Sequence, residues 1–134
     1  MKFSPSSTAR LLTCDDRLQR VLLAAIEDTP VDFGITCGHR GKVEQDRCCK
    51  AGLSKTPWPT SKHNSEPSLA IDFVPFIDGK AQWDNREAFR DVAHHILMTA
   101  DRMGVGLRWG GTWTSSVNDP LAKFVDMPHI ELKG

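Results

Sequence analysis

The chain has 134 residues and a formal net charge of zero, because 17 basic residues balance 17 acidic ones. This balance argues against binding driven by a nucleic-acid phosphate backbone and against a polybasic membrane anchor. With 40% hydrophobic and 25% charged residues, the composition is typical of a globular protein, and the length predicts one domain over residues 1–134.

Neither a secretory signal nor a membrane span is evident in the sequence. Residues 1–10 lack the apolar stretch of a signal, and no apolar run reaches membrane-spanning length. We therefore expect a chain made in the cytoplasm, with no membrane insertion. The four cysteines are then expected to be reduced thiols.

The first predicted helix begins near Thr13, a candidate N-cap residue, and ends before Pro30. An apolar stripe at helical spacing is expected to face the core. It consists of Leu18, Val21, Leu22, Ala25 and Ile26. Residues 31–37 then alternate between apolar and polar, which predicts a half-buried strand.

A turn carrying His39 and Arg40 follows this strand, and residues 42–51 are predicted to form a short helix. Residues 53–68 contain three prolines and four serines, so we expect a long loop there. Loops of this length in compact domains are usually functional or disordered.

The next strand is predicted over residues 69–74, and residues 75–83 are expected to form a turn or hairpin. The second long helix has Asp84 as its candidate N-cap residue, Glu87 at the capping-box position and Gly104 as its stop. Its apolar stripe is expected to complete the core.

A third strand is expected over residues 105–109, ended by Gly110-Gly111, and residues 112–127 form a second long loop. A short strand over residues 129–132 closes the chain. Helices interleaved with a few antiparallel strands predict a small α+β domain, in which an antiparallel sheet packs with two or three helices.

Three residues far apart in the sequence form a candidate metal site on one face of the sheet. Ile71 and its neighbours point to the core, so Asp72 projects from the opposite face, and His129 does the same in the last strand. His63 lies in the loop just before the first of these strands. Two imidazoles and one carboxylate are a known ligand set for catalytic zinc, with the fourth position left for water.

Catalysis at such a site also needs a carboxylate that moves the proton of the water to the leaving amine. Asp126, three residues before His129, is the candidate. Glu131 projects on the same side as His129 and could orient its ring.

Three short motifs, in order along the chain, resemble one family of enzymes. They are Ser61-Lys62-His63, Ala70-Ile71-Asp72 and Asp126-Met127-Pro128-His129-Ile130-Glu131. The ordered triple is similar to the zinc D-alanyl-D-alanine carboxypeptidases and L-alanyl-D-glutamate endopeptidases, and most of all to their single-domain phage endolysins. The resemblance covers residues 36–132 and includes Arg40 with Gln45, Trp58-Pro59, and Arg108-Trp109-Gly110-Gly111 with Trp113.

The resemblance implies that His63, Asp72 and His129 bind Zn²⁺ and that Asp126 is the catalytic carboxylate. It further implies that Arg40 binds a substrate carboxylate or stabilises the oxyanion. Ser61 would contact the substrate or support a ligand.

The sequence departs from the family pattern in three places. The interval from His63 to Asp72 is longer than in many relatives, so residues 64–68 are expected to loop out. Thr112 stands where an acidic residue is common, and His39 stands where a tyrosine is common. None of these changes removes a proposed ligand.

The function implied by the resemblance is hydrolysis of the L-alanyl-D-glutamate bond in the stem peptide of bacterial peptidoglycan, leading to lysis of a phage host. The enzyme would be a monomer, present in the host cytoplasm until its release to the wall, with no separate wall-binding domain. D-alanyl-D-alanine cleavage is the alternative reaction. A non-catalytic module that binds peptidoglycan around a structural zinc is the alternative from another class.

Other sites are less favoured. Cys37, His39, Cys48 and Cys49 could form a structural zinc site, but they contain no Cys-x-x-Cys pair. Cys37 paired with a histidine could act as a nucleophile, yet no orienting third group is evident. His94 is expected on a helix surface. Trp113 is expected mainly to pack, with the lining of a glycan site as the alternative.

Overall fold

The computed structural model describes residues 1–133 and contains four α-helices and a five-stranded sheet in that range. In chain order the elements are α1 (Pro5–Leu11), α2 (Asp16–Asp28), β1 (Asp32–Cys37), α3 (Lys42–Lys50), a 3-10 helix η1 (Lys62–Asn64), β2 (Ala70–Ile77), β3 (Lys80–Ala81), α4 (Arg86–Arg102), β4 (Leu107–Trp109) and β5 (His129–Leu132). The predicted α+β class is confirmed, with one helix more than the two or three expected.

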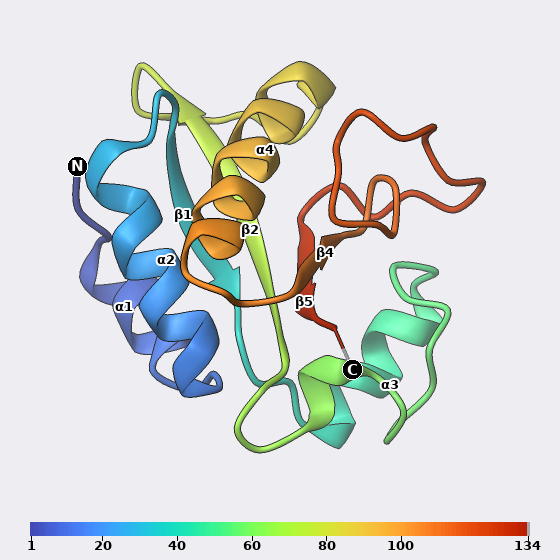
Figure 1. Ribbon diagram of the computed structural model, residues 1–134. Helices are drawn as coiled ribbons and strands as arrows, with labels where there is room; N and C mark the ends of the chain where they lie inside the picture. Colours follow the sequence, from blue (N-terminus) through green and yellow to red (C-terminus); the bar gives the residue numbers. More distant parts are fainter. Residues whose placement is uncertain (134) are drawn as a thin grey trace.

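The sheet has the order β1-β2-β5-β4, with every pair antiparallel, and β3 forms a hairpin with β2. Figure 1 shows α4 crossing one face of the sheet beside α2, while α3 lies near the lower ends of β2 and β5. Because β2 and β5 are each paired on both sides, they are the two central strands. Asp72 in β2 lies opposite Cys37 of β1 and opposite His129 of β5.

The hydrophobic core lies between the sheet and the pair α2 and α4, and both predicted apolar stripes face it. All five residues of the α2 stripe are buried. The predicted stripe of α4 is buried from Phe89 to Ala100, but its last member, Met103, is exposed at the C-cap of the helix. The sheet contributes alternate residues, among them Ile71 and Phe73. Since these alternate residues point to the core, Asp72 between them projects from the other face.

The helix starts differ from those predicted. Asp15, not Thr13, caps α2, because its carboxylate accepts from the backbone N–H of Arg17 at 2.9 Å. The Thr13 hydroxyl donates instead to Arg10 O. Asn85, not Asp84, caps α4 and accepts from Ala88 N. In both cases the predicted residue lies one or two positions before the true cap.

The loop between α3 and β2 is more ordered than its composition suggested. Asn64 and Ser68 are buried, so the expected looping out is wrong for these two residues. Ser68 pairs with residues 13 and 15 through backbone hydrogen bonds. Only Ser65 and its neighbours lie outward, where Ser65 O contacts the ring of His39 at 3.0 Å. The insertion is thereby tied to the start of α2.

Two smaller expectations are met within residues 1–133. The four cysteines are free thiols. Helices long and apolar enough to cross a membrane are absent from this range.

Candidate active site

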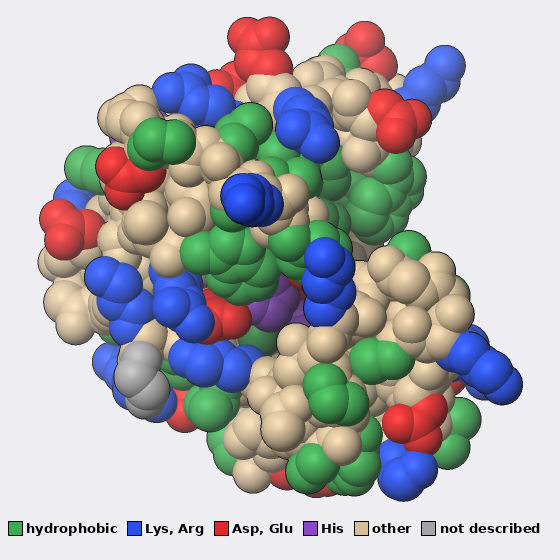
Figure 2. All heavy atoms as spheres, turned by 90° about the vertical axis from the view of Figure 1, so that its right-hand side faces the viewer, with side chains coloured by type: hydrophobic (Ala, Val, Ile, Leu, Met, Phe, Trp, Pro, Cys, Tyr) green, Lys and Arg blue, Asp and Glu red, His purple; other side chains and the backbone are tan. Residues whose placement is uncertain are grey.

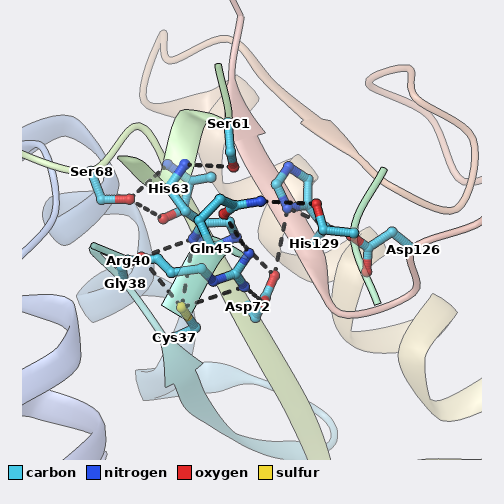
Figure 3. A network of polar contacts seen from close by, with 12 residues as sticks. Cys37, Gly38, Arg40, Gln45, Ser61, His63, Ser68, Asp72, Asp126 and His129 are labelled. Carbon is cyan, nitrogen blue, oxygen red and sulfur yellow. Dashed lines mark hydrogen bonds and ion pairs between the residues drawn. The ribbon is translucent and has the colours of Figure 1, made fainter. Parts of the chain in front are cut away.

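The predicted ligands come together on the outer face of the central strands. His63 Nε2 lies 3.2 Å from Asp72 Oδ1, and His129 Nδ1 lies 3.5 Å from the same oxygen. Figure 3 shows the two imidazoles on either side of this carboxylate. The ring centroids of the two histidines are 5.1 Å apart. Asp72 thus joins residues from three elements, η1, β2 and β5.

Each imidazole is oriented by its other nitrogen. His63 Nδ1 lies 2.8 Å from Gly38 O, and since a carbonyl only accepts, this nitrogen must donate its hydrogen. His129 Nε2 lies 2.8 Å from Glu131 Oε1 and donates in the same way. The nitrogens that face Asp72 are therefore the ones that carry a lone pair when the rings are neutral.

Each of these lone pairs faces the same carboxylate oxygen, at 3.2 and 3.5 Å, and each contact is repulsive unless a proton or a metal ion lies between the two atoms. Ligands held about 2.0–2.1 Å from a tetrahedral zinc ion lie roughly 3.3–3.4 Å apart, close to the spacings around Asp72. The orientation of the rings and the type of donor therefore fit a bound metal ion. Among the described residues, the ligand atoms of Asp72, Asp126 and His129 form one compact group that could hold a metal, and those of Cys37, His63 and Asp72 form another. The two groups share Asp72, and neither contains both histidines.

The charges of the site shift the acid–base behaviour of its members. Burial alone lowers the pKa of the His63 imidazolium, but the Asp72 carboxylate outweighs it and raises this pKa to about 10. Burial raises the pKa of Asp72, yet the two histidines together hold it far below its ordinary range. Without a metal ion, these shifts favour a protonated His63 imidazole beside an ionised Asp72 carboxylate.

Asp126 lies beside the two histidines and Asp72, at a longer distance than the two contacts between the histidines and Asp72. Its Oδ2 is 3.9 Å from His129 Nδ1, and the two residues begin and end one turn, in which His129 N bonds to Asp126 O. Burial, and then the nearby Asp72 carboxylate, raise the pKa of Asp126 above its ordinary value. A carboxyl with a raised pKa beside a metal site can both accept and return a proton.

Gly110 fixes the position of this turn. Its N–H bonds to His129 O, and its carbonyl accepts from Asp126 N. A Cβ at this position would lie 2.2 Å from Asp126 O, so only glycine allows so close an approach. The glycines that end the third strand therefore also position the turn that carries Asp126 and His129.

Arg40 lies in the site, and its guanidinium is directed at Asp72. Its Nη2 is 3.2 Å from Asp72 Oδ2, the oxygen that the histidines leave free, and its backbone N–H donates to His63 O at 2.7 Å. Nη1 donates to Gln45 Oε1. The guanidinium lines the cavity as well, so it can meet a substrate only while it also holds Asp72.

Ser61 forms a hydrogen bond with the backbone of His63, and Glu131 forms one with the ring of His129. Ser61 caps η1, and its hydroxyl accepts from His63 N at 3.2 Å. Glu131 is buried and pairs with the cations Arg108 and Lys62, at 2.7 and 3.3 Å. Hydrogen bonds from His129 and these cations outweigh burial and lower the pKa of Glu131 to about 2. Its carboxylate is therefore ionised at neutral pH.

Sequence reasoning did not foresee the role of Gln45, whose side chain is fully buried. Its oxygen accepts from Arg40 and from Asn64 Nδ2, and its nitrogen donates to Thr56 O at 2.6 Å. Gln45 thus connects α3 to η1 and to the loop that lies between these two helices. The resemblance named this glutamine, but nothing in the spacing indicated these partners.

Cys37, a candidate for a structural zinc site or a nucleophile, lies beside His63 and Arg40. Its Sγ is 3.8 Å from His63 Nδ1 and 3.7 Å from Arg40 Nη2. Cys49 instead contacts Thr56 O. His39 turns onto the 64–68 segment, where its Nε2 pairs with Glu66.

A cavity of about 540 Å³ opens over the site. Figure 2 shows histidine at the floor of a hollow that is framed by basic, acidic and hydrophobic side chains. Its lining includes four cations, Arg40, Lys55, Lys62 and Arg108, and three carboxylates, Asp72, Asp126 and Glu131. It also includes three aromatic residues, Trp83, Trp113 and Phe124.

Comparison with known proteins identifies the same peptidase family that the motifs resemble, over residues 1–133. A family described as phage L-alanyl-D-glutamate peptidase matches residues 1–133. The chain belongs to this family. It is 34% identical over 135 residues to the L-alanyl-D-glutamate peptidase of Escherichia phage T5, covering 98% of this chain and 97% of that protein. The crystal structure of the Serratia marcescens L-Ala D-Glu endopeptidase ChiX superposes with a TM-score of 0.82 at 26% identity, covering 99% of this chain and 90% of that one.

Proposed function

We propose that this family member is a zinc-dependent peptidase that hydrolyses the L-alanyl-D-glutamate bond of the peptidoglycan stem peptide and so lyses a phage host. The observation that carries the proposal is the convergence of two oriented imidazole nitrogens on Asp72 Oδ1, in a chain that belongs to this peptidase family. The enzyme would act as a monomer, held in the host cytoplasm until it reaches the wall.

In this proposal Zn²⁺ is held by His63 Nε2, Asp72 Oδ1 and His129 Nδ1. When bound, the ion supplies a water molecule of lowered pKa and polarises the carbonyl of the scissile bond. Zinc is favoured over magnesium or calcium because two of the three donors are imidazole nitrogens.

The protein's own groups then handle the proton and the charge. Asp126 takes the proton of the water and returns it to the leaving amine, a role that suits its raised pKa and its place beside His129. Arg40 holds the free oxygen of Asp72 and keeps a positive charge at the cavity wall. Glu131 keeps the ring of His129 in the ligating tautomer.

The test compares Asp126→Asn with the wild type on purified cell walls at equal zinc content. We expect the wild type to clear the walls and to release new amino termini on D-glutamate, and Asp126→Asn to lose this activity by about a hundredfold or more, as is usual for removal of a general base. The control is Asp119→Asn, an exposed carboxylate in the same loop, which should behave as the wild type.

Three outcomes would contradict parts of the proposal. Equal activity of Asp126→Asn would exclude Asp126 as the base. New termini at D-alanine alone, seen in the fragment masses, would replace the proposed bond by the D-alanyl-D-alanine bond. Wall binding with no cleavage by the wild type would favour a binding module.

A further inference from the structure

The exposed tryptophan of the cavity has no role in the chemistry described above. Trp83 is 54% exposed, whereas the other three tryptophans of the described chain are buried or half-buried. One of these, Trp113, donates from Nε1 to Phe124 O and packs on the ring of His129. Trp113 is thus part of the cavity wall, and Trp83 offers the open aromatic surface.

The strand register places Trp83 at one end of the site. Gln82 N donates to Pro75 O at 2.9 Å, so Trp83 lies beside the third residue of β2 after Asp72. At about 3.3 Å per residue, Pro75 is roughly 10 Å along the strand from Asp72. Figure 1 places the start of α4, three residues after Trp83 in the sequence, at the upper ends of the strands.

The opposite end of the site carries the cations. Glu131 pairs with Ala70, on the other side of Asp72 along β2. Arg108 and Lys62 gather on the carboxylate of Glu131 there, so one negative charge is shared by two positive charges. The cavity therefore has the exposed ring of Trp83 at one end and the cations Arg108 and Lys62 at the other, where Trp113 lies near Arg108, with the predicted ligands between them.

The two sides of the scissile bond in the proposed substrate also differ from each other. On the amino side, a single L-alanine connects the bond to the lactyl ether of a muramyl sugar. On the carboxyl side, D-glutamate and the next residue carry the carboxylates. One residue plus the lactyl group spans roughly 7–10 Å, the distance from Asp72 to the segment beside Trp83.

We propose that Trp83 forms a subsite for the muramyl sugar, which stacks on the indole face and fixes the direction of the stem peptide, with the carboxylates toward Arg108 and Lys62. This inference rests on the proposed function. The surroundings suit a sugar, because Trp83 also lines a second pocket that contains the polar side chains of Gln82, Asp84 and Asn85. An aromatic surface beside a few polar groups is the usual composition of a small-molecule site.

The experiment compares two substrates that differ only in the sugar, the stem tetrapeptide with an N-lactyl group on its L-alanine and the same peptide carrying N-acetylmuramic acid. The quantity measured is the ratio of their kcat/KM values. We expect the wild type to prefer the sugar-bearing peptide, and Trp83→Leu to lower this ratio about tenfold, which corresponds to about 1.4 kcal/mol. Trp83→Phe, which keeps an aromatic face, should restore part of the preference.

Two controls separate stacking from packing. Leucine preserves apolar contact with Phe89, whose ring centroid lies 6.4 Å from that of Trp83. Ile77→Ala removes another exposed apolar side chain of the same hairpin and should keep the wild-type ratio. An unchanged ratio in Trp83→Leu would overturn the inference.

Product inhibition of the wild type gives an answer even if a Trp83 variant does not fold. N-acetylmuramyl-L-alanine should inhibit about tenfold more strongly than N-acetyl-L-alanine, and equal inhibition would overturn the inference. A wild type that cleaves neither substrate would instead overturn the proposed function, and this inference with it.

Discussion

Glu131 Oε1 accepts a hydrogen bond from His129 Nε2 at 2.8 Å, and this contact leaves His129 Nδ1 directed at Asp72. The carboxylate is itself held by Arg108 and Lys62. The orientation of the His129 imidazole therefore depends on a network that extends across β4, β5 and η1.

Replacement of Glu131 by glutamine tests this dependence. The amide keeps the shape of the side chain but removes the charge that favours the donating Nε2–H of His129. We expect zinc affinity to fall about 10–100-fold, the usual effect of losing a partner that orients a ligand. Competition with a chelator of known affinity measures it, and Glu44→Gln on the exposed face of α3 is the control. Unchanged zinc affinity would show that Glu131 does not orient His129.

Zinc binding should release protons. The metal-free protein holds a proton on His63, because the Asp72 carboxylate raises the imidazole pKa from 6.5 to about 10 against the effect of burial. Zinc needs the neutral ring, so at pH 7 we expect at least one proton to be released and the affinity to rise with pH. Calorimetry in two buffers of different ionisation enthalpy counts these protons. A binding enthalpy independent of the buffer would contradict the prediction.

The same shift predicts how the metal-free fold depends on pH. A histidine whose pKa is raised on folding stabilises the protein fully below its unfolded pKa of 6.5, and this contribution is lost as the pH rises through about 10. We therefore expect the free energy of unfolding of the metal-free protein to decrease between these values. Urea titrations over this range measure it, and His63→Gln should reduce the slope and leave the part that comes from the raised pKa of His129. Equal slopes in both proteins would exclude the His63–Asp72 pair as the cause.

Gln45 should be important for stability although it does not contact the ligands directly. Gln45→Leu would remove one partner from each of Arg40 Nη1, Asn64 Nδ2 and Thr56 O. Asn64 Nδ2 keeps its bond to Arg40 O and Thr56 O keeps its contact with Cys49, so Arg40 Nη1 is the group left orphaned. Because an orphaned buried group costs about 1–3 kcal/mol, we expect the free energy of unfolding to fall by that amount. Gln82→Leu, whose amide makes one exposed hydrogen bond, is the matched control. Equal stability of the two variants would contradict this account of Gln45.

The repetitive elements of the fold could be predicted because their burial follows a period. The stripe of α2 appears in the structure, but the alternation predicted for β1 is wrong, because Phe33, Gly34 and Ile35 are buried in succession. Helix α1 was missed because its buried residues, Ser7 and Leu11, form no apolar stripe. Ser7 is held instead by the backbone of Ile35, a contact between residues far apart in the chain.

The candidate site likewise has a part that the sequence could predict and a part that it could not. Strand alternation placed Asp72 and His129 on one face, and the structure has them there. The contacts of Gln45 and Asn64 could not be foreseen, because they depend on how η1 folds against α3. Nor could spacing indicate that Arg40 would bond to Asp72, since the two residues meet only when β1 and β2 pair.

The most direct test of the whole account is the zinc content of His63→Ala and His129→Ala, compared with His94→Ala on the exposed face of α4. We predict one zinc per chain in the wild type and in His94→Ala, and loss of zinc in the other two variants, together with the rise in Tm that bound metal confers. Retention of stoichiometric zinc by either His63→Ala or His129→Ala would contradict the assignment of that histidine as a ligand.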